Sequence, residues 1–466
     1  MNKRRLLSLL LALGLLCSLA LPCAATDLSK VSKLVQNKTV DAKAALLVNI
    51  SAEEGDVIYF EQNARDRVYP ASITKVMTAL LVMEALERGN ISLDEPITAS
   101  TDTWLDIPPD GSTANIQIGE VMTVEQLLYC MLLPSANEAA NVLAQTLCGQ
   151  VSTFVKLMNQ RAMELGCVNT HFVNPHGIHD PNHYTTCYDL YLIAREAMKY
   201  DTFRKIVSTD EITIPPTNMT DKERVYYNTN GLLTHKKYSG YTFDGCIGIK
   251  TGSTQDAGYC LLSAARREGT TLLSVVMGAD TVVDTAGTHR HQFSESASLL
   301  QWGFDNFSYH SIMDSRDPVA EVRVELAKDV DSVLIAPAES LSALLPNDVT
   351  GKSFSTSIEK EESVEAPVEV GQKLGTMTVF LQNRPYGTVD LVALANVERS
   401  DFLARKQSIE DVISSLWFRV LLLVFAALIL VTILRNTVFI PQRHKKIKTR
   451  KPKAAKPASY KGKRGR

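Results

Sequence analysis

Hydrophobic and polar positions show two different periodicities over the first 280 residues of the chain. From Ser72 to about residue 88 apolar side chains recur at helical spacing, and Gly89-Asn90 ends the run. The same spacing predicts helices at 124–133, 139–147, 158–165 and 190–198. Strand-like runs occupy 45–50, 57–60, 212–214, 245–250, 259–264 and 271–277. Helices enclosed between early and late strands predict an α/β (α+β) sandwich on an antiparallel sheet, within residues 26–310.

The pattern changes after about residue 308. Short alternating segments at 319–326, 333–335, 374–381 and 387–393 are separated by turn residues. They predict a small all-β domain over 315–396, followed by a polar helical linker over 397–415.

The N-terminus has the organisation of a secretory signal. Lys3, Arg4 and Arg5 precede an apolar run over 6–21, and Pro22-Cys23-Ala24-Ala25 offers small residues for cleavage. We therefore expect a signal peptide over 1–25, with an uncleaved N-terminal anchor as the alternative.

The C-terminus predicts a membrane span. Residues 416–434 are almost entirely apolar and would extend about 28 Å as a helix. The tail at 435–466 carries 13 Lys/Arg and no acidic residue. Such a tail is typical of the cytoplasmic side, so we expect a single-pass protein of the cell membrane, anchored in lipid, with an extracytoplasmic catalytic domain. A nucleic-acid-binding tail is the alternative.

Charge is distributed very unevenly. Setting aside the 13 cations of the tail and three at the N-terminus turns the net charge of −2 into −18 for residues 6–434. An acidic surface repels phosphate, so we expect no nucleic-acid partner for this part.

Six cysteines lie beyond the expected signal peptide: Cys130, Cys148, Cys167, Cys187, Cys246 and Cys260. Export permits disulfides, and Cys246 could face Cys260 if two antiparallel strands turn near residue 253. Free buried thiols are the other interpretation, and the spacings do not resemble a metal site.

The first chemical motif is Ser72-Ile73-Thr74-Lys75 at the start of an apolar helix. Serine and lysine at i and i+3 share one helix face, and a lysine made neutral by burial or a second cation could deprotonate the serine. A helix-capping Ser72 is the structural alternative. The spacing recurs at Ser357 to Lys360, in an acidic stretch without a following apolar helix, so we treat that copy as fortuitous.

The second motif is Ser135-Ala136-Asn137, between two helical segments. A hydroxyl here could relay a proton, and the Asn137 amide could hold a substrate amide. Alternatively, Ser135 and Glu138 would form a capping box for the next helix.

The third motif is Lys250-Thr251-Gly252, which ends a strand-like run. A cation and a hydroxyl at a strand edge suit a substrate carboxylate, and Gly252 would allow a peptide backbone to approach closely. Lys250 could also be the second cation that lowers the pKa of Lys75. An exposed turn is the alternative.

In order and separation, these motifs resemble those of the low-molecular-mass penicillin-binding proteins, which are serine-type D-alanyl-D-alanine carboxypeptidases. Further similar segments are Asn174-Pro175-His176-Gly177, Asp256-Ala257-Gly258-Tyr259 and Trp302-Gly303-Phe304. The resemblance covers about 40–310 and extends to the β domain. It implies the fold shared by serine β-lactamases and penicillin-binding proteins, with a helical subdomain.

The resemblance also implies roles for individual residues. Ser72 would be the nucleophile, Lys75 the general base and Ser135 the proton relay. Asn137, Lys250, Thr251 and Gly252 would bind substrate, and the backbone N–H groups of Ser72 and Ser253 would form the oxyanion hole. Two positions depart from the family: Ser253 replaces the histidine or threonine of many relatives, and Thr229 replaces an arginine found in some.

His176, His179, Asp180 and His183 suggest a metal site, but Pro175, Gly177 and Pro181 prevent the helix that their spacing would need. We expect no metal or other cofactor.

The function that the resemblance implies is removal of the terminal D-alanine from peptidoglycan stem peptides ending in D-Ala-D-Ala, with β-lactams as covalent inhibitors. A β-lactamase, a DD-endopeptidase or transpeptidase on the same fold, and a catalytically idle surface binding protein are the alternatives.

Overall fold

The computed structural model describes residues 30, 32–51, 55–284 and 287–438. The expected signal peptide at 1–25 and most of the basic tail lie outside the described residues. Contacts divide the chain into two compact units. The first comprises Met1–Asp317, Pro337–Glu359 and Thr376–Asp390, and the second Pro318–Ala336, Lys360–Gly375 and Leu391–Arg466.

The first unit contains a five-stranded antiparallel sheet in the order β2-β1-β9-β8-β7. Its strands are β1 (Ala44–Asn49), β2 (Val57–Gln62), β7 (Cys246–Thr254), β8 (Gly258–Arg267) and β9 (Thr270–Ala279). The N-terminal strand β1 pairs with β9, so residues more than 220 positions apart share one sheet; Leu46, for example, lies opposite Val275. Strand β7 forms one edge of this sheet.

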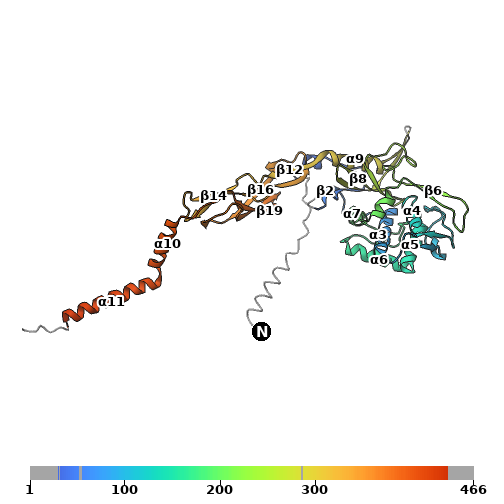
Figure 1. The fold of residues 1–466 in the computed structure, drawn as a ribbon. Helices are drawn as coiled ribbons and strands as arrows, with labels where there is room; N and C mark the ends of the chain where they lie inside the picture. Colours follow the sequence, from blue (N-terminus) through green and yellow to red (C-terminus); the bar gives the residue numbers. More distant parts are fainter. Residues whose placement is uncertain (1–29, 31, 52–54, 285–286, 439–466) are drawn as a thin grey trace, which may run out of the picture. The chain divides into compact units, whose positions relative to one another are not determined.

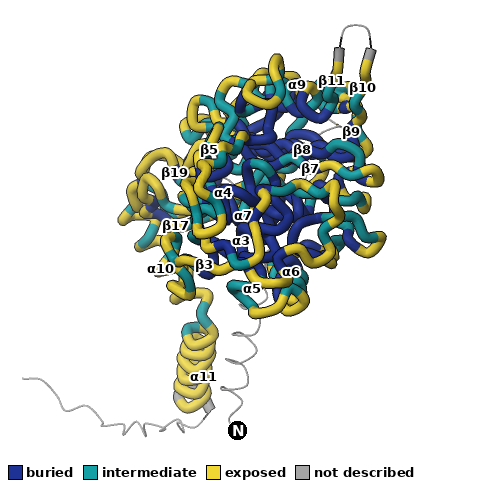
Figure 2. Tube along the Cα trace, turned by 90° about the vertical axis from the view of Figure 1, so that its right-hand side faces the viewer, coloured by how far each residue is buried: buried dark blue, intermediate teal, exposed yellow. Residues whose placement is uncertain are grey.

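Both faces of the sheet are buried, because its side chains alternate between two hydrophobic clusters. Leu46 and Val48 belong to the cluster that contains the apolar residues of the central helices. Ala45 and Leu47 belong to the second cluster, with Leu299 and Leu300 of α9 (His291–Asn306). Figure 2 shows the buried strands β7 to β9 and helices α3 and α7 as the dark interior of this unit.

The helices of the first cluster form the helical subdomain (Figure 1). They are α3 (Lys75–Glu87), α4 (Val124–Leu132), α5 (Asn137–Cys148), α6 (Val151–Glu164), α7 (Cys187–Ala197) and α8 (Asp201–Val207). Helix α3 is buried on nearly every side, and a short 3-10 turn, η2 (Ala71–Thr74), leads into it. The predicted α/β fold is confirmed, and the predicted helices and strands lie within a few residues of those observed, apart from the helix expected at 158–165, where α6 begins seven residues earlier.

Smaller elements surround this framework. They are α2 (Lys33–Gln36), η3 (Thr101–Trp104) and the strand pairs β3 (Pro96–Thr98) with β4 (Val121–Thr123), β5 (Glu211–Ile214) with β6 (Arg224–Tyr227), and β10 (Thr281–Asp284) with β11 (Gly287–Arg290).

The region after α9 is all-β, as predicted. Strands β12 (Phe307–Met313) and β15 (Leu341–Pro346) pair, and a six-stranded sheet has the order β16-β18-β19-β14-β13-β17. Its strands are β13 (Ala320–Glu325), β14 (Ser332–Pro337), β16 (Phe354–Lys360), β17 (Ser363–Glu365), β18 (Lys373–Leu381) and β19 (Arg384–Ala393); a 3-10 turn, η4 (Gly351–Ser353), precedes β16. Because Ser357 and Lys360 lie on the extended strand β16, they face opposite sides, which agrees with our interpretation of this copy as fortuitous.

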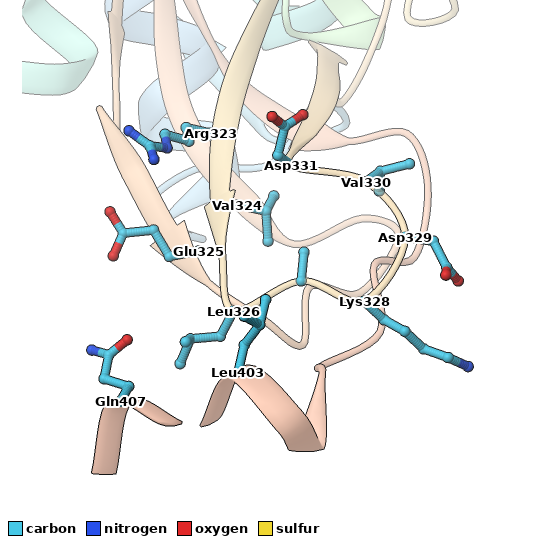
Figure 3. Close-up of a pocket in the computed structure, with 11 residues that line it drawn as sticks. Arg323, Val324, Glu325, Leu326, Lys328, Asp329, Val330, Asp331, Leu403 and Gln407 are labelled. Atoms are coloured by element: carbon cyan, nitrogen blue, oxygen red, sulfur yellow. The ribbon is translucent and has the colours of Figure 1, made fainter. Parts of the chain in front are cut away.

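Two helices end the described chain: α10 (Asp401–Ser414) and α11 (Leu416–Val438). Within the described residues, Leu416–Arg435 is the one segment long and apolar enough to cross a membrane, and it is entirely unburied. In the second unit, the end of β13, the β13–β14 loop and α10 line a cavity of about 790 Å³ (Figure 3). None of the motif residues lines it.

All six cysteines of the described chain are free, so the suggested Cys246–Cys260 disulfide is wrong. The turn between β7 and β8 lies near residue 256 and not 253, which changes the register. Cys246 faces Ala265, and Cys260 faces Gly252.

Candidate active site

The first motif forms a tight turn that places Ser72 and Lys75 together. Ser72 lies within η2, and Lys75 begins α3. Lys75 Nζ is 2.9 Å from Ser72 Oγ. The preceding Ala71 adopts φ +47°, a strained conformation for a residue with a Cβ. The predicted proximity of the hydroxyl and the amine is therefore observed. The alternative of a helix-capping Ser72 is wrong, because neither η2 nor α3 has a side-chain cap.

Lys75 is fully buried and surrounded by acceptors. Besides Ser72 Oγ, its Nζ donates to Asn137 Oδ1 at 2.7 Å and to the His176 carbonyl at 2.7 Å. Burial, followed by the charge of Lys250, lowers the pKa of Lys75 well below its usual value. Its neutral form is thus stabilised, and a neutral amine can accept the hydroxyl proton of Ser72.

A loop over 174–183 packs against η2 and the first turn of α3. Thr74 Oγ1 hydrogen-bonds His183 Nε2 at 2.9 Å, and Thr78 Oγ1 donates to the Pro175 carbonyl at 2.6 Å. A Cβ on Gly177, whose φ is +90°, would lie 1.8 Å from the Ala71 carbonyl oxygen. Only glycine therefore permits this approach.

The histidines of this loop have separate partners. Burial lowers the pKa of His183 to about 3 and that of His176 well below its usual value, so both rings are neutral at physiological pH. His176 Nδ1 accepts from the Ile178 N–H, and His179 lies 3.7 Å from the Asp256 carboxylate. Over the described ranges, no three His, Cys, Asp or Glu side chains converge as metal ligands.

The second motif presents an unsatisfied hydroxyl. Ser135 adopts φ +73°, and its Oγ is buried without a hydrogen-bond partner among the described residues. The alternative capping box is wrong, because the N-cap of α5 is Ala136 and forms no side-chain cap. The Glu138 carboxylate instead accepts from Thr113 Oγ1 at 2.7 Å and the Ala114 N–H at 2.6 Å. The Ser135 hydroxyl is left available to a ligand.

The third motif lies within β7 and is not an exposed turn. Lys250 is buried, and its Nζ donates to the Thr251 carbonyl at 3.1 Å. Burial, with a smaller contribution from Lys237, lowers the pKa of Lys250 to about 7. Thr251 Oγ1 lies 2.6 Å from Thr229 Oγ1. Thr229, the neutral residue at the position where some relatives have an arginine, therefore contacts the third motif directly.

Gly252 brings the edge of the sheet against the turn that carries Ser72. A Cβ at Gly252 would lie 2.9 Å from the Pro70 carbonyl oxygen and 3.1 Å from the Ser72 amide nitrogen. The absence of a side chain is therefore what permits this contact between β7 and η2.

The three motifs border one cavity of about 130 Å³. Ser72, Ser135, Thr251, Gly252 and Ser253 line it, while Lys75 and Lys250 are buried. Sequence reasoning missed several other lining residues: Ser112, Lys237, Tyr238, Arg290, Gln292 and Phe293.

Two of the missed residues are cations. Lys237 Nζ lies 5.9 Å from the centre of the Tyr238 ring, and the Arg290 guanidinium lies 4.5 Å from the same ring. They come from segments outside any motif, and only the basic run at 235–237 could have indicated one of them. The cavity thus combines a nucleophile, a buried amine and an electropositive wall, an arrangement suited to acyl transfer from an anionic substrate.

Comparisons with known proteins agree with this chemistry. Residues 31–281 match a family model described as D-alanyl-D-alanine carboxypeptidase, and 307–399 match one described as penicillin-binding protein 5, C-terminal domain. The chain is 30% identical to D-alanyl-D-alanine carboxypeptidase DacF of Bacillus subtilis, covering 86% of this chain and 96% of that one. It is 31% identical to DacA of Haemophilus influenzae, over 72% and 80% of the two chains.

Solved structures give the same result. The D-alanyl-D-alanine carboxypeptidase DacD of Francisella tularensis has 26% identity and a TM-score of 0.59, over 81% of this chain and 98% of that one. Penicillin-binding protein 5 of Haemophilus influenzae has 28% identity and a TM-score of 0.55, over 78% and 99%.

Proposed function

The chain belongs to the D-alanyl-D-alanine carboxypeptidase family of serine peptidases, and on this premise we propose that it removes the terminal D-alanine from peptidoglycan stem peptides ending in D-Ala-D-Ala. The observation that carries the proposal is the 2.9 Å contact between Ser72 Oγ and the buried amine of Lys75, whose pKa is lowered. The β-lactamase and idle-scaffold alternatives gain no support from the relatives.

In the proposed mechanism, neutral Lys75 takes the hydroxyl proton of Ser72 as Ser72 Oγ attacks the carbonyl between the two D-alanines. The N–H groups of Ser72 and Ser253 stabilise the oxyanion. Ser135 passes the proton to the leaving amine, and water then hydrolyses the acyl-enzyme.

Substrate binding would involve three regions of the cavity. Lys250 and Thr251 hold the terminal carboxylate, and Asn137 holds an amide of the peptide. Gly252 allows the peptide backbone to lie against β7. A β-lactam presents a carboxylate and a strained amide to the same groups, so it acylates Ser72.

We further propose that 1–25 is a cleaved signal peptide, that residues 26–310 are the peptidase domain, and that 416–434 cross the membrane. The 315–396 domain and the 397–415 linker then connect an extracytoplasmic active site to lipid, and the 435–466 tail is cytoplasmic. The exposed apolar surface of α11 supports this arrangement.

The direct test is intact-protein mass spectrometry after brief exposure to benzylpenicillin. We expect the wild type to gain one penicilloyl adduct, Ser72→Ala to gain none, and Ser357→Ala to behave as the wild type. Release of D-alanine from an acyl-D-Ala-D-Ala peptide is then assayed on the same proteins. An unmodified wild-type protein together with intact drug would contradict the acyl-enzyme mechanism. Rapid hydrolysis of the drug would instead indicate a β-lactamase.

A further inference from the structure

Glu138 is a buried acid beside the active site to which the proposed mechanism gives no role. It lies in the first turn of α5, one residue after Asn137, whose Oδ1 accepts from Lys75 Nζ at 2.7 Å. The residue is fully buried. Removing a carboxylate from water is costly, so the surroundings of this side chain have to account for its position.

The two oxygens of the Glu138 carboxylate have different surroundings. Oε1 accepts from Thr113 Oγ1 at 2.7 Å, from the Ala114 N–H at 2.6 Å and from the Ile116 N–H at 3.4 Å. Oε2 is buried and has no hydrogen-bond partner among the described residues. The three donors therefore fix the carboxylate in place, and its second oxygen is left without a donor.

The segment that supplies these donors also holds Asn137. The Asn137 N–H donates to the Ser112 carbonyl at 2.9 Å, and Ser112 lines the active-site cavity. The first turn of α5 is thus tied to residues 112–116 by a backbone contact and by the Glu138 side chain. Both ties keep Asn137 in the position from which its Oδ1 accepts from Lys75.

Glu138 supplies negative charge in the surroundings of Lys75. Burial and the charge of Lys250 lower the pKa of Lys75, whereas the Glu138 carboxylate raises it. The other titratable groups that face Lys75 are His176 and His183, and burial lowers the pKa of both, so their rings are neutral. Within the described ranges, Glu138 is therefore the acid that offsets Lys250 at the base.

No neighbouring group neutralises Glu138 by a direct contact. The nearby cation Arg224 is paired with Glu120, and no ion pair joins it to Glu138 in the part of the chain that the structure describes. Cys130 and Tyr226 also face Glu138, but burial raises the pKa of both, so neither is charged at physiological pH. The field of the Glu138 carboxylate therefore reaches Lys75 through a low-dielectric interior, where charges interact more strongly than in water.

Acylation creates a new charge at Lys75. As Ser72 Oγ forms its bond to the substrate carbonyl carbon, the Ser72 proton moves to Lys75 Nζ, and the carbonyl electrons move onto the oxyanion. The resulting ammonium is buried beside Lys250, which disfavours it. A fixed carboxylate offsets this repulsion, because charge that is already in place stabilises a transition state without reorganisation.

We propose that Glu138 is a positioning residue for acylation: its carboxylate stabilises the ammonium that Lys75 becomes, and its hydrogen bonds hold Asn137 against Lys75. This inference rests on the proposed function and deepens it. The two charges near Lys75 then act at different moments. Lys250 favours the neutral amine before proton transfer, and Glu138 favours the ammonium after it.

The test is the pH profile of benzylpenicillin acylation, followed by intact mass on the full-length protein. Glu138→Gln keeps an oxygen acceptor for the three donors and removes the charge. The plateau rate at high pH should fall roughly tenfold, because the ammonium loses its counter-charge. The acid limb, where the rate falls toward low pH, should move to lower pH by roughly half a unit or more, because Lys75 then loses its proton more easily.

Two further variants separate charge from packing. Glu138→Asp keeps the negative charge, so its acid limb should stay at the wild-type position even if the shorter side chain slows acylation. Glu120→Gln is the matched control, because Glu120 is equally buried and its partner Arg224 contacts the same segment through the Ala114 carbonyl, at 3.4 Å. Its acid limb should coincide with that of the wild type. The position of the limb depends only on the folded molecules, so partial unfolding of a variant does not obscure it.

The outcomes distinguish this inference from the function on which it rests. An unmoved limb in Glu138→Gln, an equal shift in Glu120→Gln, or an equal shift in Glu138→Asp would overturn the role of Glu138, while acylation of the wild type kept the proposed function intact. A wild type that is not acylated at any pH would instead remove the proposed function itself.

Discussion

Two lysines without an acidic ion-pair partner in the described chain dominate the chemistry at the residue scale. Lys75 and Lys250 are both buried, and burial alone disfavours the charge on each. The positive charge of Lys250 lowers the pKa of Lys75 further. Lys250, which we propose binds the substrate carboxylate, therefore also favours the neutral form of Lys75, the proposed base.

This coupling predicts the pH dependence of a variant. In Lys250→Met the neighbouring positive charge is lost, so the pKa of Lys75 rises and its neutral fraction at a given pH falls. The acid limb of the benzylpenicillin acylation rate should move to higher pH, in addition to an overall loss of roughly tenfold or more from the missing carboxylate contact. The measurement is the acylation rate from pH 5 to 9.

Lys236→Met is the control, because Lys236 pairs with Glu211 and does not line the active-site cavity. Its profile should match the wild type. An acid limb unchanged in Lys250→Met would show that Lys250 does not influence the base.

The sequence predicts the residue-scale site unevenly. Ser72 and Lys75 are three residues apart in one turn, so their contact follows from local geometry. Lys237 and Arg290 reach the same cavity from distant segments that only the tertiary fold brings together. The sequence also could not predict that Ser135 Oγ lacks a hydrogen-bond partner in the described chain, because it left a capping box open as an alternative. That box does not form: Ser135 has φ +73°, and the N-cap of α5 is Ala136.

At the element scale, periodicity identified the main helices and strands because burial leaves a regular apolar pattern. Helix α3 is buried on nearly every side, so it was identified by the length of its apolar run and by the Gly89-Asn90 stop more than by periodicity. Helix α9 was missed because three positions of its buried face, Gln292, Ser296 and Gly303, are not apolar, so the apolar pattern is interrupted. The register of β7 was misjudged because a turn can move by a few residues without altering the apolar pattern.

The contact between the 174–183 loop and η2 predicts a large effect from one methyl group. Gly177→Ala would place its Cβ 1.8 Å from the Ala71 carbonyl oxygen, at a φ of +90°. We expect the free energy of unfolding to fall by about 2–4 kcal/mol and acylation of Ser72 to slow, because the turn must shift. Urea denaturation and penicillin acylation measure the two effects.

The Gly149→Ala variant is the control that distinguishes the effect of the steric clash from the effect of a positive φ alone. Gly149 also has a positive φ, +72°, but a Cβ there meets nothing within 4 Å. Its variant should lose only about 1 kcal/mol and acylate normally. Equal losses in both variants would refute the close-contact explanation.

For the whole molecule, the two family matches and the apolar C-terminal helix follow one another along the chain. The sequence predicted this order because each region has a distinct composition. It could not predict how the compact units divide the β region, since that depends on long-range contacts.

The proposed anchoring by α11 predicts the outcome of a truncation. A chain that ends at Ser414 lacks the exposed apolar segment Leu416–Arg435, so it should move from the membrane fraction to the soluble fraction. Its benzylpenicillin acylation rate should stay within about twofold of the full-length value. Retention of the truncated chain in membranes after carbonate washing would show that another segment anchors it.

The six free cysteines have a consequence for how this protein matures. Cys130, Cys187 and Cys260 are enclosed in the core, and burial raises the pKa of each thiol, so the reactive thiolate is scarce once the chain has folded. No covalent cross-link among these residues has to form for the fold to be complete. The described part of the chain should therefore fold under reducing conditions, and these three thiols should react with oxidants before the core closes and not afterwards, whereas Cys148 stays partly exposed.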